Sequence, residues 1–83
     1  MADVLLYTLS TCPFCIRAKR LLDGRSVAYR EVVVDADPEA RREVMRRTGH
    51  PTFPQIFIGD RFVGGCDDLH ALDREGALDS MLA

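Results

Sequence analysis

A short apolar run followed at once by a helical pattern constrains the fold most. Residues 4–8 read VLLYT, which is typical of a buried strand. From residue 14, apolar side chains recur at the spacing of one helix face, at Cys15, Ala18, Leu21 and Leu22. Pro13 suits the first turn of a helix, and Gly24 favours a helix end. The chain is therefore expected to begin with a strand, a tight turn and an amphipathic helix.

A second strand and helix follow the first pair. Residues 27–34 are rich in β-branched and aromatic side chains, which predicts a strand. Asp37 and Pro38 form a helix start, since aspartate caps the first turn and proline fits inside it. We expect this helix to run to Thr48 and to close at Gly49.

The last third of the chain predicts a hairpin and two short helices. Residues 55–58 and 61–63 read as strands joined by a tight Gly-Asp turn. Cys66 or Asp67 is expected to cap a third helix, and residues 78–82 suggest a short final one. The order βαβαββα predicts an α/β fold with a mixed four-stranded sheet flanked by helices.

Length and composition fit one small domain. The 83 residues, 47% hydrophobic and 29% charged, are expected to form a single domain over residues 1–83. A formal charge of −2 provides no positive field for nucleic acid or anionic lipid, and no run of residues is apolar enough to span a membrane. The first residues do not resemble a secretory signal. We expect a cytoplasmic monomer with neither nucleic acid nor membrane as a partner.

Two cysteines lie at the junction of the first strand and helix, in STCPFC. Backbone N–H groups at a helix start favour a thiolate, so Cys12 is the candidate nucleophile, with its sulfur expected at the exposed helix tip. Cys15 lies one turn further on and nearer the core, where it can act as a resolving thiol. A metal site or two unrelated thiols remain alternatives. No metal is expected, since Cys66, His50 and His70 lack ligand spacing and the two histidines read as surface or packing residues.

Pro54 stands just before the expected third strand. A trans proline there would remove a backbone donor needed for strand pairing, so we expect a cis Phe53–Pro54 bond. The backbone of Phe53 would then face a neighbouring site as a short edge for an extended peptide. An edge-strand proline without such a role remains the alternative.

Three motifs in order, CPFC, TFPQIFI and GGCDDL, resemble the dithiol glutaredoxins of the small bacterial type over nearly the whole chain. The resemblance implies a thioredoxin-like fold. It also implies a glutathione-dependent oxidoreductase that reduces protein disulfides and glutathione mixed disulfides, and so serves electron transport and cell redox homeostasis. Glutathione would be the reductant, and disulfide-containing or glutathionylated proteins would be the partners.

The resemblance also assigns residues to glutathione. The backbone of Phe53 would pair with its cysteine moiety, Cys66 and Asp67 would receive the γ-glutamyl end, and Arg41 would meet the glycine carboxylate. Free cysteines are often small buried groups, so Cys66 is expected to have a structural or ligand-lining role through its backbone, with a third redox thiol as the alternative. The full expected set is Phe14, Arg41, Thr52, Phe53, Pro54, Gly65, Cys66 and Asp67. Two carboxylates on glutathione suit a helix N-terminus and an arginine, and its ammonium suits Asp67 or Asp68.

The chain departs from the usual family pattern at three positions. Phe14 replaces a tyrosine, Phe53 is bulkier than the usual valine, and Leu9 stands where many members carry lysine. Without that lysine, a thiolate at Cys12 depends on the helix terminus and on Arg17. Affinity for glutathione therefore does not follow from the motif alone.

Two other functions remain open. A glutaredoxin-like electron donor reduced by thioredoxin reductase is disfavoured by GGCDDL, since those proteins resemble thioredoxin at that end. An iron–sulfur module, with Cys12 of two subunits and two glutathiones as ligands, is disfavoured by Pro13, which makes the cysteine turn rigid.

Overall fold

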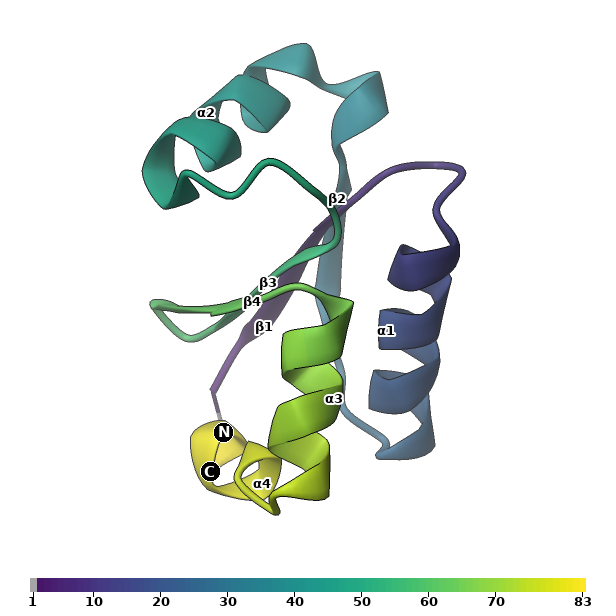
Figure 1. The fold of residues 1–83 in the computed structure, drawn as a ribbon, viewed down its shortest axis with the longest axis vertical. Helices are drawn as coiled ribbons and strands as arrows, with labels where there is room; N and C mark the ends of the chain where they lie inside the picture. Colours follow the sequence, from purple (N-terminus) through teal and green to yellow (C-terminus); the bar gives the residue numbers. More distant parts are fainter. Residues whose placement is uncertain (1) are drawn as a thin grey trace.

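Four strands form one mixed sheet in the computed structural model, which describes residues 2–83. The central strand β1 (Val4–Thr8) pairs in parallel with β2 (Arg30–Val33) on one side. On its other side it pairs antiparallel with β3 (Gln55–Ile58), which forms a hairpin with β4 (Arg61–Gly64) at the edge. The sheet order is β2-β1-β3-β4 (Figure 1). The predicted α/β fold with a mixed four-stranded sheet is confirmed.

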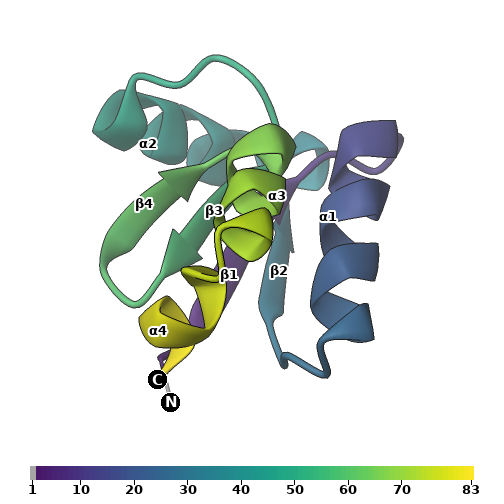
Figure 2. The ribbon, with the colours of Figure 1, turned by 60° about the horizontal axis from the view of Figure 1, so that its bottom comes forward.

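The helices cover both faces of this sheet. The long helix α1 (Pro13–Gly24) and α3 (Cys66–Arg74) lie side by side on one face, with the short α4 (Leu78–Leu82) below them (Figures 1 and 2). The 3₁₀ turn η1 (Val34–Ala36) and α2 (Pro38–Thr48) lie on the opposite side. Among residues 2–83, no helix is long and apolar enough to cross a membrane.

Alternating side chains of β1 divide the core into two clusters. Val4 and Leu6 point toward α1 and α3, and this larger cluster is closed by α4. Leu5 and Tyr7 point the other way, toward Phe57 and the side of α2. The second cluster is smaller and contains Cys12, Cys15, Val34, Val44, Phe53 and Phe57. The cysteine pair is thus part of the core on the side of α2.

The second strand is shorter than residues 27–34. Val27 donates its N–H to the carbonyl of Leu22 at 2.9 Å, so it belongs to the turn that leaves α1. At the other end Val34 starts η1, because its carbonyl accepts the N–H of Asp37 at 3.1 Å. Val27 is partly buried and Val34 fully buried by these turns, and neither joins the strand ladder.

The start of α3 also differs from the sequence prediction. Gly65 is the N-cap, so Cys66 and Asp67 are the first two helical residues and not caps. The carboxylate of Asp68 explains the shift, since it reaches back and accepts the Gly65 N–H at 2.9 Å. The backbone N–H groups of Cys66 and Asp67 consequently lie at the open end of the helix, where no intrahelical acceptor exists.

Candidate active site

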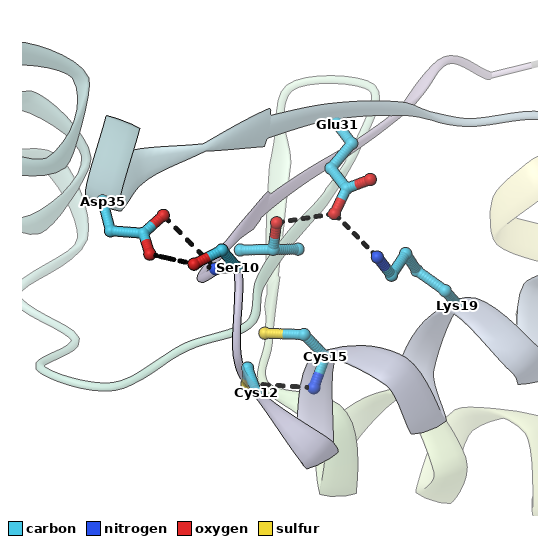
Figure 3. Close-up of polar contacts among 7 residues, drawn as sticks. Ser10, Cys12, Cys15, Lys19, Glu31 and Asp35 are labelled. Carbon is cyan, nitrogen blue, oxygen red and sulfur yellow. Dashed lines mark hydrogen bonds and ion pairs between the residues drawn. The ribbon is translucent and has the colours of Figure 1, made fainter. Parts of the chain in front are cut away.

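Cys12 forms the N-cap of α1. Its sulfur accepts the backbone N–H of Cys15 at 3.1 Å, a contact that stabilises negative charge on the sulfur (Figure 3). Pro13 occupies the first helical turn as predicted. The expected exposure of the sulfur is wrong, however, because Cys12 is only 7% exposed. Phe53, from a loop distant in the sequence, packs in the same cluster and covers it.

Cys15 lies one turn further on and is 1% exposed, in the core position that the sequence predicts. Burial and then a hydrogen bond with Cys12 raise the pKa of the Cys15 thiol to about 12. The two cysteines therefore have different chemistry: Cys12 has a donor aimed at its sulfur, and Cys15 is held as a thiol. No disulfide joins Cys12, Cys15 or Cys66 in this structure.

The loop that carries the pair is tied to η1 by one carboxylate. Asp35 accepts the backbone N–H of Ser10 on both oxygens at 3.2 Å, and the Ser10 hydroxyl donates to the same group (Figure 3). These bonds hold the pKa of Asp35 below its usual value. The turn before Cys12 is thereby fixed against the end of β2.

The Phe53–Pro54 bond is cis, as the sequence predicts. The carbonyl oxygen of Phe53 lies 3.9 Å from the sulfur of Cys12, within reach of the thiol as an acceptor. The backbone just before β3 thus runs past the sulfur. Phe53 is 8% exposed and belongs to the same buried cluster as Cys12.

A cavity of about 540 Å³ opens beside this backbone. Its lining contains every residue that the sequence assigned to glutathione: Phe14, Arg41, Thr52, Phe53, Pro54, Gly65, Cys66 and Asp67. Leu9, His50, Pro51 and Asp68 complete the lining. We call this cavity the groove. The side formed by residues 50–54 and Arg41 is called the loop wall, and the side formed by residues 65–68 is called the α3 wall.

The two walls carry opposite charge. On the loop wall, the Arg41 guanidinium carbon lies 5.6 Å from the centre of the Phe53 ring, so the cation rests on an aromatic face. The α3 wall presents the carboxylates of Asp67 and Asp68 next to the N-terminal N–H groups of α3. An extended ligand with separated charges fits between them.

Cys66 faces the core more than the groove. It is 4% exposed, and burial raises the pKa of its thiol. Its contribution to the groove is therefore the backbone at the start of α3. Arg17, from α1, lies with its guanidinium carbon 5.9 Å from the centre of the exposed Phe14 ring. Phe14 and Arg17 thus flank the cysteine pair on the outside.

Sequence reasoning missed the support of the loop wall. Gln55 is fully buried, donates to the His50 carbonyl at 2.6 Å and accepts from the Thr48 hydroxyl at 2.8 Å. His50 packs its ring edge-on against Phe62 and lies 3.1 Å from the Thr52 hydroxyl through Nε2. The available signal was a glutamine at the head of the apolar strand QIFI. His50 combines the expected packing with a place in the groove.

Comparison with known proteins gives one consistent family. Residues 4–63 match the sequence model described as glutaredoxin. The chain is 52% identical to a glutaredoxin of Pseudomonas aeruginosa, over 100% of this chain and 99% of that protein.

Solved structures agree. The solution structure of glutaredoxin from Brucella melitensis has 54% sequence identity and a TM-score of 0.88, and the match covers 99% of this chain and 89% of the Brucella chain. A crystal structure of a buckwheat glutaredoxin-glutathione complex has 28% sequence identity and a TM-score of 0.90, and the match covers 98% of this chain and 76% of the buckwheat chain. The thioredoxin-like fold that the motifs implied is confirmed.

Proposed function

The chain belongs to the glutaredoxin family of glutathione-dependent thiol–disulfide oxidoreductases, and on this premise we propose that it uses the groove to bind glutathione beside Cys12. Its substrates are then glutathione mixed disulfides and protein disulfides, and glutathione is the reductant. The single observation that supports this is the convergence of all the expected contact residues on one cavity next to the cysteine pair. Action as a monomer in the cytoplasm is part of the same proposal.

Deglutathionylation needs only Cys12. Its thiolate attacks the glutathione sulfur of the mixed disulfide, a Cys12–glutathione disulfide forms, and the substrate leaves as a thiol after taking up a proton. A second glutathione thiolate then attacks this disulfide, which yields oxidised glutathione and restores Cys12. The Cys15 N–H that points at the Cys12 sulfur supports its role as the attacking and leaving group.

Reduction of a protein disulfide adds Cys15. After Cys12 has formed a mixed disulfide with the protein, the Cys15 sulfur attacks the Cys12 sulfur and expels the protein thiolate. The Cys12–Cys15 disulfide that results is reduced by two glutathione molecules in turn. The exposed fractions support this order, because Cys15 is 1% exposed and Cys12 is 7% exposed, which leaves Cys12 as the more accessible sulfur.

The groove orients glutathione by charge. The glycine carboxylate is assigned to Arg41, and the γ-glutamyl carboxylate to the free N–H groups at the start of α3. The γ-glutamyl ammonium is assigned to Asp67 or Asp68, and the backbone of Phe53 pairs with the cysteine moiety. This direction puts the glutathione sulfur toward Cys12, since the Phe53 carbonyl lies 3.9 Å from the Cys12 sulfur.

The test separates the two cysteines. Cys12→Ser is expected to abolish glutathione-coupled reduction of both a small glutathione mixed disulfide and a protein disulfide, whereas Cys15→Ser abolishes only the second. NADPH consumption through glutathione reductase measures both reactions, and far-UV circular dichroism checks folding. Equal loss from both substitutions would reject the monothiol step. Activity that requires thioredoxin reductase in place of glutathione would favour the electron-donor alternative.

A further inference from the structure

Lys19 lies four residues after Cys15 on α1, so the two side chains leave the same helix face. Figure 3 shows both side chains directed from α1 toward the sheet, with Glu31 of β2 beyond them. The Lys19 ammonium lies 2.9 Å from Glu31 Oε2, and the two side chains are 29% and 27% exposed. A cation is thus held close to the otherwise apolar surroundings of the Cys15 sulfur.

The ion pair is itself anchored to the central strand. Thr8 is fully buried, and its hydroxyl donates to the same Glu31 oxygen at 2.6 Å. This bond lowers the pKa of Glu31, and Glu31 in turn raises the pKa of Lys19, so the pair is fully charged at neutral pH. The next residue along α1, Arg20, is exposed instead. Lys19 is therefore a fixed charge and Arg20 a solvated one.

The resolving step requires negative charge where burial opposes it. A thiol with a pKa of about 12 supplies little thiolate at neutral pH, yet the Cys15 sulfur must become anionic as it attacks. Glu31 is a poor acceptor for that proton, since its pKa lies below its usual value. Two groups lower the pKa of Cys15: a hydrogen bond with the Leu9 backbone and, with a smaller effect, the charge of Lys19. Lys19 is the one of the two that carries a full positive charge.

We propose that Lys19 is a positioning residue for the resolving step, its ammonium stabilising the charge that develops on the Cys15 sulfur during attack on Cys12. The inference rests on the role of Cys15 in the proposed function. In the step, the Cys15 S–H and the Cys12–substrate disulfide are broken and the Cys12–Cys15 disulfide is formed. The proton passes through solvent to the departing substrate thiolate, so no further oxidant or reductant is needed.

The experiment uses 5,5′-dithiobis(2-nitrobenzoate) in place of a physiological substrate, with Cys66→Ala in every variant to leave two reactive thiols. The first thionitrobenzoate released reports attack by Cys12, and the second reports attack by Cys15 on the resulting mixed disulfide. Both are followed by stopped-flow absorbance. Because the reagent replaces glutathione, the two phases do not depend on glutathione binding.

Lys19→Met is expected to slow the second phase roughly three- to tenfold, because each unit added to a thiol pKa removes about tenfold in thiolate and restores about threefold in nucleophilicity. The first phase is expected to keep its rate. Lys19→Arg, which keeps the charge, should retain the second phase, and the matched control Arg20→Met should not change it. If Lys19→Met does not fold, Lys19→Gln takes its place.

Three outcomes would overturn the inference: an unchanged second phase in Lys19→Met, equal slowing in Lys19→Arg, or equal slowing in Arg20→Met. The second outcome would indicate a packing role and the third a general effect of net charge. Loss of the first phase in the parent protein would instead reject Cys12 as the nucleophile, which contradicts the proposed function as well. Failure of glutathione-coupled turnover with both phases intact would contradict the proposed function alone.

Discussion

The two walls of the groove are held in place by different means. The loop wall depends on one buried side chain, Gln55, which reaches back across the chain to Thr48 and His50. The α3 wall depends on local backbone geometry at Gly64 and Gly65. Damage to the loop wall should therefore lower both the stability and the substrate affinity, whereas the α3 wall can be altered in smaller, more separable ways.

Residues 50–54, which form the loop wall together with Arg41, take part in none of the backbone–backbone hydrogen bonds outside the helices and strands. Residues 49–54 connect α2 to β3, and the amide of Gln55 supplies the bonds that fix them. The Thr48 hydroxyl joins the network by accepting the His50 N–H at 3.1 Å while it donates to Gln55. A polar group buried in this way is costly when its partner is removed.

Gln55→Leu, in the loop wall, is expected to have the largest effect on both stability and substrate affinity. It leaves the His50 carbonyl without its buried donor, whereas the Thr48 hydroxyl can still donate to the Val44 carbonyl at 2.9 Å. The change should cost about 2–3 kcal/mol of unfolding free energy. The KM for a glutathione mixed disulfide should rise as well, because the loop wall loses its anchor. Urea denaturation and glutathione-coupled kinetics measure the two effects.

The matched control for Gln55→Leu is Ile58→Val on the same strand. It should cost about 1 kcal/mol through lost core contacts and leave KM unchanged. An unchanged KM in Gln55→Leu would mean that the loop wall keeps its position without the amide, and the contrast between the walls would then be wrong.

Much of this site was predictable because its parts are local in the sequence. The strand at residues 4–8, the proline after Cys12 and the helix behind it follow from hydrophobic spacing and first-turn chemistry. The membership of the groove was predictable from motifs that a known family places around one ligand. The structure brings those motifs together but leaves each residue's contact with glutathione as a prediction.

The parts that sequence reasoning missed depend on distant partners. Cys12 is buried in a cluster with Phe53, which lies 41 residues away in the sequence. Gln55 reads as an ordinary strand residue until its partners at the end of α2 are known. The N-cap of α3 moved to Gly65 because Asp68 reaches back to it, a competition between neighbouring caps that spacing alone does not decide.

Gly64→Ala tests the α3 wall, with a smaller expected effect. Gly64 has a φ of +122°, and an added Cβ would overlap the carboxylate of Asp68. The strain, together with displacement of Asp68 from the Gly65 N–H, should cost about 1–3 kcal/mol in urea denaturation. Gly24→Ala is the matched control, because that position has open space and should gain up to about 1 kcal/mol. Equal stability of the two variants would show that the α3 wall is not held by its backbone.

Substitutions of Asp68 are expected to have the smallest effect on stability. Two of them distinguish its role as a cap of α3 from a role in binding glutathione. Asp68→Asn keeps an oxygen that can accept the Gly65 N–H, so its stability should change by less than about 0.5 kcal/mol. Asp68→Ala removes the acceptor and should lose about 1 kcal/mol. Both variants remove the carboxylate from the α3 wall, so both should raise KM for the glutathione substrate by a similar, roughly two- to fivefold factor if the carboxylate meets the ammonium.

Asp79→Asn, which removes an exposed carboxylate on α4, controls for net charge and should leave KM unchanged. A KM that rises only in Asp68→Ala would instead assign Asp68 to the cap alone and leave the ammonium to Asp67.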